Sequence, residues 1–150
     1  MIKENSKNKF LGGKLTVLQQ REGFRAGHDS VLLASSIPAK KGDKCLELGI
    51  GAGVVSLCLI KRVPGLFIIG IDNDKDTIKL SKENISLNGF DDYISVIKGD
   101  LNSGSNKFKS LKRHSFDHIF SNPPFYDEGE IVLPKNKNKR NAYYGEKDFI

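Results

Sequence analysis

Apolar and polar positions along the chain form two kinds of segment. Short, nearly continuous apolar runs predict buried strands, at 44–48, 66–72, 93–100 and 116–124. Longer segments with helical spacing lie between them and predict helices at 52–63 and 74–89. Strands that alternate with helices are typical of α/β domains. The pattern therefore predicts a parallel sheet with helices on both faces.

The residues before position 43 add one strand and one helix to this core. The segment "KLTVLQQ" at 14–20 predicts a short strand. A helix is expected to begin near Ser30, with Asp29 as its N-cap, and to end before Pro38. The 150 residues fit one domain. We therefore expect 1–42 to form an upstream strand and helix, and 43–150 to form the α/β core of the same domain.

The composition is that of an ordinary soluble domain, with 38% hydrophobic and 28% charged residues. No apolar run approaches the roughly 20 residues that span a bilayer, and the first residues lack the apolar region of a signal peptide, so we expect a cytoplasmic protein. Cys45 and Cys58 lie in apolar surroundings and are expected to be buried, reduced thiols. The cysteines and histidines lack the spacing of metal ligands, so no metal is expected.

The net charge of +6 is distributed unevenly. Residues 1–25 carry six Lys or Arg against two Glu, and residues 131–150 carry five against two acids, whereas residues 43–100 carry seven bases and nine acids. Basic ends around a mildly acidic centre favour a polyanionic partner such as RNA or DNA. The candidate contacts are Lys135, Lys137, Lys139 and Arg140. The alternative is a Lys/Asn-rich surface loop with no partner.

A glycine-rich loop, "ELGIGAG" at 47–53, follows the first core strand. Gly49, Gly51 and Gly53 permit a tight turn and the close approach of a ligand to the backbone. The spacing is G-x-G-x-G after an acid, whereas dinucleotide sites use G-x-G-x-x-G. Glu47 would repel a diphosphate but suits a sulfonium and an ammonium group. The loop therefore favours S-adenosylmethionine as the cofactor.

Each of the four predicted core strands ends in a polar residue: Glu47, Asp72, Asp100 and Asn122. Ligands of open α/β sheets bind at the carboxyl ends of the strands. Asp72, followed by Asn73, can accept hydrogen bonds from both hydroxyl groups of a ribose. Asp100 is placed to meet an adenine amine, with Leu101 beside the ring. Together with the glycine loop, these residues predict a nucleoside-cofactor site.

The last strand runs into "SNPPF" at 121–125. Two prolines stiffen the chain and remove two N–H donors, so that carbonyl acceptors remain. The side-chain oxygen of Asn122 and the carbonyl of Pro123, held rigid by Pro124, can draw the hydrogens of a conjugated amine out of plane and aim its lone pair at a methyl carbon. Phe125 can stack on a planar substrate. The alternative is a proline turn that merely ends a strand.

The motifs "ELGIGAG", "IDND", "GDL" and "SNPPF", in this order, resemble those of class I methyltransferases that modify amino or amide nitrogens. The upstream segment "FRAGHDSVLLA" is similar to that of bacterial tRNA(Val) adenine-N6 methyltransferases. The resemblance implies a Rossmann-like fold and methylation of adenine N6 in tRNA. It also implies that Arg25, Gly27 and Asp29 lie near the cofactor, and that the glycine loop and the four polar strand ends line it.

Three alternatives remain open: methylation of guanine N2 in ribosomal RNA, methylation of a glutamine amide in a protein, and a non-catalytic remnant that binds cofactor or RNA weakly. Such methyltransferases usually have seven strands, whereas this sequence predicts four core strands. We therefore expect the C-terminal strands to be missing, and the last strand to expose an unpaired edge and apolar surface. His118 and Asp117, in and before that strand, are expected to be structural.

Overall fold

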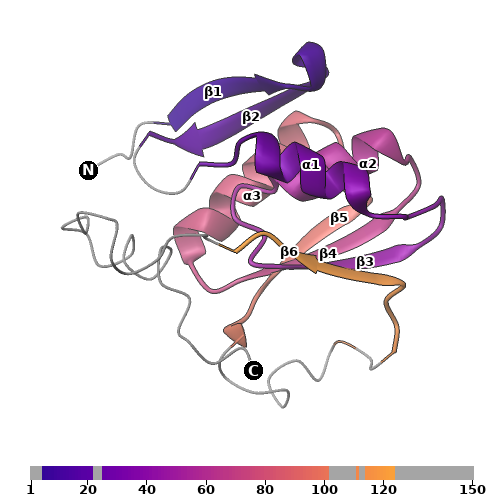
Figure 1. The fold of residues 1–150 in the computed structure, drawn as a ribbon. Coiled ribbons are helices and arrows are strands. Elements are labelled where there is room, and N and C mark those ends of the chain that lie inside the picture. Colours follow the sequence, from indigo (N-terminus) through magenta and orange to yellow (C-terminus); the bar gives the residue numbers. More distant parts are fainter. Residues whose placement is uncertain (1–4, 22–24, 102–110, 112–113, 124–150) are drawn as a thin grey trace, which may run out of the picture.

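The computed structural model describes residues 5–21, 25–101, 111 and 114–123. Its centre is a four-stranded parallel sheet with the strand order β5-β4-β3-β6 (Figure 1). The strands are β3 (Lys44–Leu48), β4 (Phe67–Asp72), β5 (Ile94–Lys98) and β6 (His118–Ser121). All four lie within the apolar runs that predicted them. The α/β class with a parallel sheet is confirmed.

Three helices lie on one face of this sheet: α1 (His28–Ser36), α2 (Val54–Arg62) and α3 (Lys75–Leu87) (Figure 1). The cap of α3 is Asp74, whose side chain accepts a hydrogen bond from the N–H of Thr77 at 2.8 Å. The prediction of Asp29 as the cap of α1 is wrong, because Gly27 is the cap and Asp29 lies in the first turn. A helical layer on the other face stays a prediction, because the described helices all lie on one face.

The core forms between the sheet and α2, which is buried from Val54 to Ile60. The side chains that the strands turn toward the helices are at most 8% exposed: Cys45, Ile68, Ile94, Val96 and Phe120. Full burial of one such aliphatic side chain stabilises a fold by about 1.5–3 kcal/mol. Cys45 and Cys58 are free and buried, as predicted.

An antiparallel hairpin stands beside the helices, formed by β1 (Asn5–Phe10) and β2 (Leu15–Gln20) (Figure 1). Alternate residues of β2 are buried, with Leu15 and Val17 at 1% and 0% exposure. The strand β2 was predicted from the segment "KLTVLQQ". The strand β1 was not, because its sequence "NSKNKF" carries a single apolar residue; its pairing with β2 makes it a strand.

The sheet face opposite the helices exposes large apolar side chains. Phe67, Tyr93 and Ile119 are 49%, 41% and 61% exposed. Within the described residues, β6 is the last strand on its side of the sheet. At β6 the exposed apolar side chain is that of Ile119, and the unpaired edge expected there stays a prediction, because residues 124–150 lie outside the described residues.

Candidate functional site

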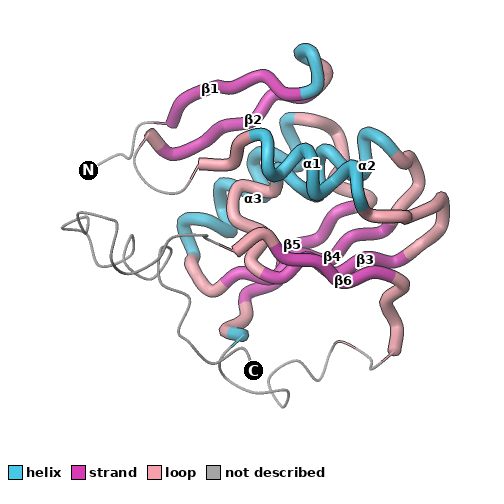
Figure 2. The backbone as a smooth tube through the Cα atoms, viewed as in Figure 1, coloured by secondary structure: helices cyan, strands magenta, loops and turns pink. Residues whose placement is uncertain are grey.

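The glycine loop joins β3 to α2 at the carboxyl ends of the strands. Because β3 pairs with β4 on one side and β6 on the other, the connections diverge at this point. Such a switch in strand order is where open α/β sheets leave room for a ligand. Figure 2 shows the connections that follow β3 and β4 as loops beside the starts of the helices.

The backbone of the loop has the left-handed conformation that its glycines permit. The φ angles of Gly49, Gly51 and Gly53 are 71°, 57° and 82°. Beneath the loop, the N–H of Ile50 donates to the carbonyl of Ile71 at 2.9 Å. A side chain at position 70 would clash there, because a Cβ on Gly70 would lie 2.2 Å from Cδ1 of Ile50. Gly70 therefore allows the loop to pack on β4, a role that the sequence did not indicate.

Asp72, at the end of β4, holds the loop from the side. Its Oδ2 accepts a hydrogen bond from the N–H of Gly51 at 3.0 Å, and its Oδ1 accepts one from the N–H of Asp74 at 3.1 Å. Burial raises the pKa of Asp72, although the N–H groups of Asp74, Gly51 and Asn73 lower it. Each carboxylate oxygen has further acceptor capacity. The group can therefore also accept hydrogen bonds from ligand hydroxyl groups.

Glu47 lies deeper, on β3. It is 1% exposed, and its Oε2 accepts a hydrogen bond from the hydroxyl of Ser56 on α2. Burial raises the pKa of Glu47 to about 8, while the bonds from Ser56 lower it and the charge of Asp72 raises it. The carboxyl group thus lies in a low-dielectric position beneath the loop. Its direct contact with a cationic ligand stays a prediction.

Asn122 is anchored by its side-chain nitrogen. Nδ2 donates to the hydroxyl of Ser30 at 3.1 Å and to Oδ2 of Asp29 at 3.3 Å. The other oxygen of Asp29 accepts a hydrogen bond from the N–H of Gly27 at 3.2 Å. The structure therefore joins the start of α1 to the end of β6, two segments 92 positions apart between Ser30 and Asn122.

This anchoring decides which atoms of Asn122 can serve a ligand. Both recorded bonds use the amide nitrogen, and no hydrogen bond to the side-chain oxygen is recorded among the described residues. Pro123, which follows, is exposed. Asn122 thus offers an acceptor whose direction is fixed by α1. Pro124 and Phe125 lie outside the described residues.

The other predicted site residues lie in different parts of the molecule. Asp100 and Leu101 follow β5, the neighbour of β4, and both are exposed, Leu101 at 37%. Asn73 is exposed beside Asp72. Arg25 instead donates to Oδ1 of Asn8 in the hairpin at 3.1 Å. The basic residues proposed to contact nucleic acid are all outside the described residues: Lys135, Lys137, Lys139 and Arg140.

Sequence reasoning missed three polar residues that support the site: Ser30, Ser56 and Asn84. They are 1%, 0% and 0% exposed, respectively. Each is a small polar residue in a helix, where the same residue type is usually solvated. The available signal was their position on the apolar face of a predicted helix, because a polar group buried there needs a partner.

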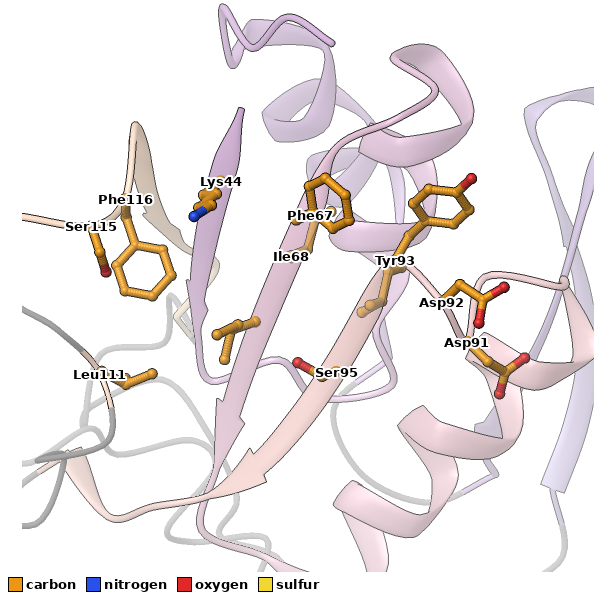
Figure 3. A pocket seen from close by; sticks show the side chains of 12 residues that line it. Lys44, Phe67, Ile68, Asp91, Asp92, Tyr93, Ser95, Leu111, Ser115 and Phe116 are labelled. Atoms are coloured by element: carbon orange, nitrogen blue, oxygen red, sulfur yellow. The ribbon is translucent and has the colours of Figure 1, made fainter. Parts of the chain in front are cut away.

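A hollow of about 510 Å³ lies elsewhere on the described surface. Figure 3 shows its lining on the open sheet face, with the rings of Phe67 and Tyr93 at the starts of β4 and β5. Their centroids are 6.0 Å apart. The lining includes none of Glu47, Asp72 or Asn122. The hollow and the carboxyl-end site are therefore separate features.

None of the described helices is long and apolar enough to cross a membrane. No group of three or more His, Cys, Asp or Glu in the same residues is arranged to hold a metal ion.

Solved structures resemble this fold at low sequence identity. TYW2 from P. horikoshii, in complex with MeSAdo, matches with a TM-score of 0.62 and 21% identity over 78% of this chain and 42% of that one. An O-methyltransferase from Bacillus cereus, in complex with SAH, matches with a TM-score of 0.55 and 17% identity over 66% and 46% of the two chains. These likenesses show a Rossmann-like fold.

Curated relatives are more similar in sequence. The tRNA1(Val) (adenine(37)-N6)-methyltransferase of Tolumonas auensis is 30% identical over 131 residues, which cover 87% of this chain and 52% of that protein. Its namesake in Escherichia coli O157:H7 is 27% identical over 136 residues, 89% and 54% of the two. The chain thus spans about half the length of the curated relatives it matches.

A family model covers most of the chain. Residues 15–135 match the methyltransferase small domain, a segment that runs from β2 through all of the polar strand ends described above. The chain therefore belongs to the methyltransferase small domain family.

Proposed function

We propose that this protein transfers a methyl group from S-adenosylmethionine to an exocyclic amine, and that the amine is N6 of an adenine in tRNA. The anchored side chain of Asn122 carries the proposal. It places a fixed acceptor at the same sheet edge as the glycine loop. Without the loop, an asparagine before prolines would only end a strand.

The residues of the site fit this cofactor. Gly49, Gly51 and Gly53 have positive φ angles and carry no side chain, so a nucleoside can approach the backbone at these positions. The neighbouring ionisable groups, Glu47 and Asp72, are acids, which suit a sulfonium, an ammonium group and ribose hydroxyls and would repel a diphosphate. When bound, the cofactor supplies an electrophilic methyl group. Asp72 would hold the ribose, and Asp100 with Leu101 would meet the adenine.

The protein's own groups would act on the substrate amine. The oxygen of Asn122 and the carbonyl of Pro123 would accept its two hydrogens, so that the nitrogen lone pair points out of the aromatic plane. Ser30 and Asp29 would keep the Asn122 oxygen in this direction. No strong general base is needed, because the proton can leave after the transfer. Phe125 would stack on the base.

The choice of substrate rests on the relatives that methylate tRNA and on the basic ends of the chain. We infer that Lys135, Lys137, Lys139 and Arg140 contact the RNA backbone, that the protein acts in the cytoplasm, and that residues 1–150 form the N-terminal part of one methyltransferase domain, with 1–42 upstream of the core at 43–150.

The test is transfer of label from methyl-labelled S-adenosylmethionine to bulk tRNA and, in parallel, to ribosomal RNA and protein, followed by mass spectrometry of the nucleosides. We expect N6-methyladenosine. N2-methylguanosine in ribosomal RNA, or label confined to protein, would replace the proposed substrate. Absence of both cofactor binding and label would overturn the proposed function.

A further inference from the structure

The side chain of Asn84 makes three hydrogen bonds from the buried face of α3. Its Oδ1 accepts from the N–H of Leu18 at 2.7 Å, and its Nδ2 donates to the carbonyl of Leu18 at 2.9 Å. The same nitrogen donates to the carbonyl of Ala52 at 2.9 Å. Since Asn84 is 0% exposed, these bonds are shielded from water. One side chain thus contacts both the hairpin and the glycine loop.

The bond from Asn84 to the Ala52 carbonyl holds one end of a peptide group whose other end is held within the loop. The N–H of Gly53, in the same peptide group as the Ala52 carbonyl, donates to Ile50 at 2.9 Å. Asn84 holds the carbonyl end of that peptide plane. The plane lies at the end of the glycine run, where Gly53 leads into α2 and permits several backbone conformations. Its orientation sets the direction of the neighbouring loop amides.

A second asparagine, Asn88, lies four residues after Asn84 as the C-cap of α3 and provides a comparison within the molecule. Its Oδ1 accepts from the N–H of Thr16 at 3.0 Å, and its Nδ2 donates to the carbonyl of Thr16 at 2.8 Å. The further bond of Asn88 runs to the carbonyl of Asn84 at 2.7 Å, within the helix. Each asparagine therefore forms two hydrogen bonds to the backbone of one β2 residue, as a neighbouring strand would. Asn84 also donates a hydrogen bond to the glycine loop.

We propose that Asn84 is a positioning residue for the cofactor loop, which it holds in its ligand-binding conformation through the Ala52 carbonyl. The inference rests on the proposed binding of S-adenosylmethionine. A positioning role differs from a purely structural role in its effect on cofactor binding. Loss of Asn84 should weaken cofactor binding beyond what loss of the hairpin contact explains, whereas loss of Asn88 should affect only the hairpin contact and the end of α3.

The experiment measures S-adenosylmethionine binding by calorimetry and thermal unfolding for the whole chain and for Asn84→Ala and Asn88→Ala. We expect both variants to unfold at lower temperature. Asn84→Ala should bind the cofactor about tenfold more weakly, as expected for the loss of one buried hydrogen bond. Asn88→Ala should stay within about twofold of the wild type, because its lost bonds do not reach the loop.

A second variant and a second measurement cover the case in which Asn84→Ala does not fold. Asn84→Ser keeps a small polar group that is too short to span the distance to Ala52, and it should show the same loss of affinity. In amide NMR spectra, the Gly53 signal should shift and exchange faster in the Asn84 variants than in Asn88→Ala.

Two results would overturn the inference, and they are distinguishable. Equal cofactor affinity in folded Asn84 and Asn88 variants removes the positioning role and leaves the proposed function intact. A wild-type chain that binds no S-adenosylmethionine removes the proposed function and the inference together.

Discussion

The two ends of the parallel sheet use acidic side chains in opposite ways. At the amino end, Asp117 accepts a hydrogen bond from the N–H of Lys44 at 2.8 Å, and Asp43 accepts one from the N–H of Lys40 at 3.0 Å. Asp43 also lies 3.1 Å from Nε2 of His118. The Lys40 N–H lowers the pKa of Asp43, and the His118 contact lowers it further, although burial raises it. These acids connect strands and turns.

At the carboxyl end, the environment disfavours the charge. Burial raises the pKa of Glu47 to about 8 and that of Asp72 above its ordinary value. Buried acids with a raised pKa lower the free energy of unfolding as pH rises toward that pKa. Acids with shifted pKa values that lie close together beside a loop are typical of functional sites. Acids at the ends of strands therefore differ in their environment. Hydrogen bonds from the protein favour the charged form of Asp43, whereas burial disfavours the charged forms of Glu47 and Asp72 despite their hydrogen bonds.

The largest effect is expected at Asn122. Asn122→Ala should reduce methyl transfer by about 10²–10³-fold, as for loss of an orienting hydrogen bond, with little change in cofactor affinity. Asn122→Asp should fail nearly as badly, because it loses the donor to Ser30 and faces the Asp29 carboxylate. Single-turnover methylation of tRNA, with cofactor binding measured in parallel, tests both.

Asn122→Ala with wild-type rates would mean that the prolines simply end a strand. The matched control is Ser30→Ala, which keeps the Asn122 oxygen but removes one of the two acceptors that hold its nitrogen. Its rate should lie between those of the wild type and Asn122→Ala.

The next effect is expected at Asp72. Asp72→Ala removes the acceptor of the Gly51 N–H as well as the proposed ribose contact. Charge-assisted hydrogen bonds contribute roughly 1.5–3 kcal/mol, so S-adenosylmethionine should bind about tenfold to a hundredfold more weakly. Calorimetry measures this directly. Unchanged affinity in a folded variant would remove Asp72 from the site.

A pH experiment examines Glu47. Its pKa is raised in the fold from 4.5 to about 8, so the folded state retains a proton that the unfolded chain has lost between these values. The free energy of unfolding should therefore fall as pH rises through this window, and Glu47→Gln should flatten the fall. Chemical unfolding at several pH values measures it. Equal slopes in both proteins would contradict the assignment.

The same group should respond to a cationic cofactor. If positive charge favours the Glu47 carboxylate, binding near pH 7 should release a proton, and affinity should rise toward pH 8. Calorimetry in two buffers of different ionisation enthalpy counts the released protons. Glu47→Gln should release fewer, and since Asp72 is present in both proteins, the difference reports Glu47 alone.

The smallest effect is expected at the amino end. Asp117→Ala removes one hydrogen bond to the Lys44 N–H, for a loss of about 1 kcal/mol in unfolding free energy. Asp117→Asn keeps an acceptor oxygen and should lose less. Cofactor affinity should not change in either variant. A drop in affinity comparable to that of Asp72→Ala would end the distinction between the two sheet ends.

The sequence predicted the core strands, the three helices and the sheet class, because segments that pack in the core carry apolar side chains whatever their partners are. It also determined the glycine loop, since the positive φ angles of Gly49, Gly51 and Gly53 require that residue type. The structural role expected for Asp117 and His118 is confirmed by their bonds to Lys44 and Asp43. The apolar runs and the glycine spacing are local properties, which a linear pattern can encode.

The tertiary structure alone decided how distant residues meet. The anchoring of Asn122 by Ser30, the bond from Ser56 to Glu47 and the contact of Asn84 with Ala52 all join segments far apart in the chain. The same holds for β1, whose sequence is polar and which is a strand through pairing with β2. A single polar residue carries no sign of its partner, because the partner depends on how helices pack on the sheet. Only the folded chain brings donor and acceptor within 3 Å or so and removes the water that would otherwise satisfy both.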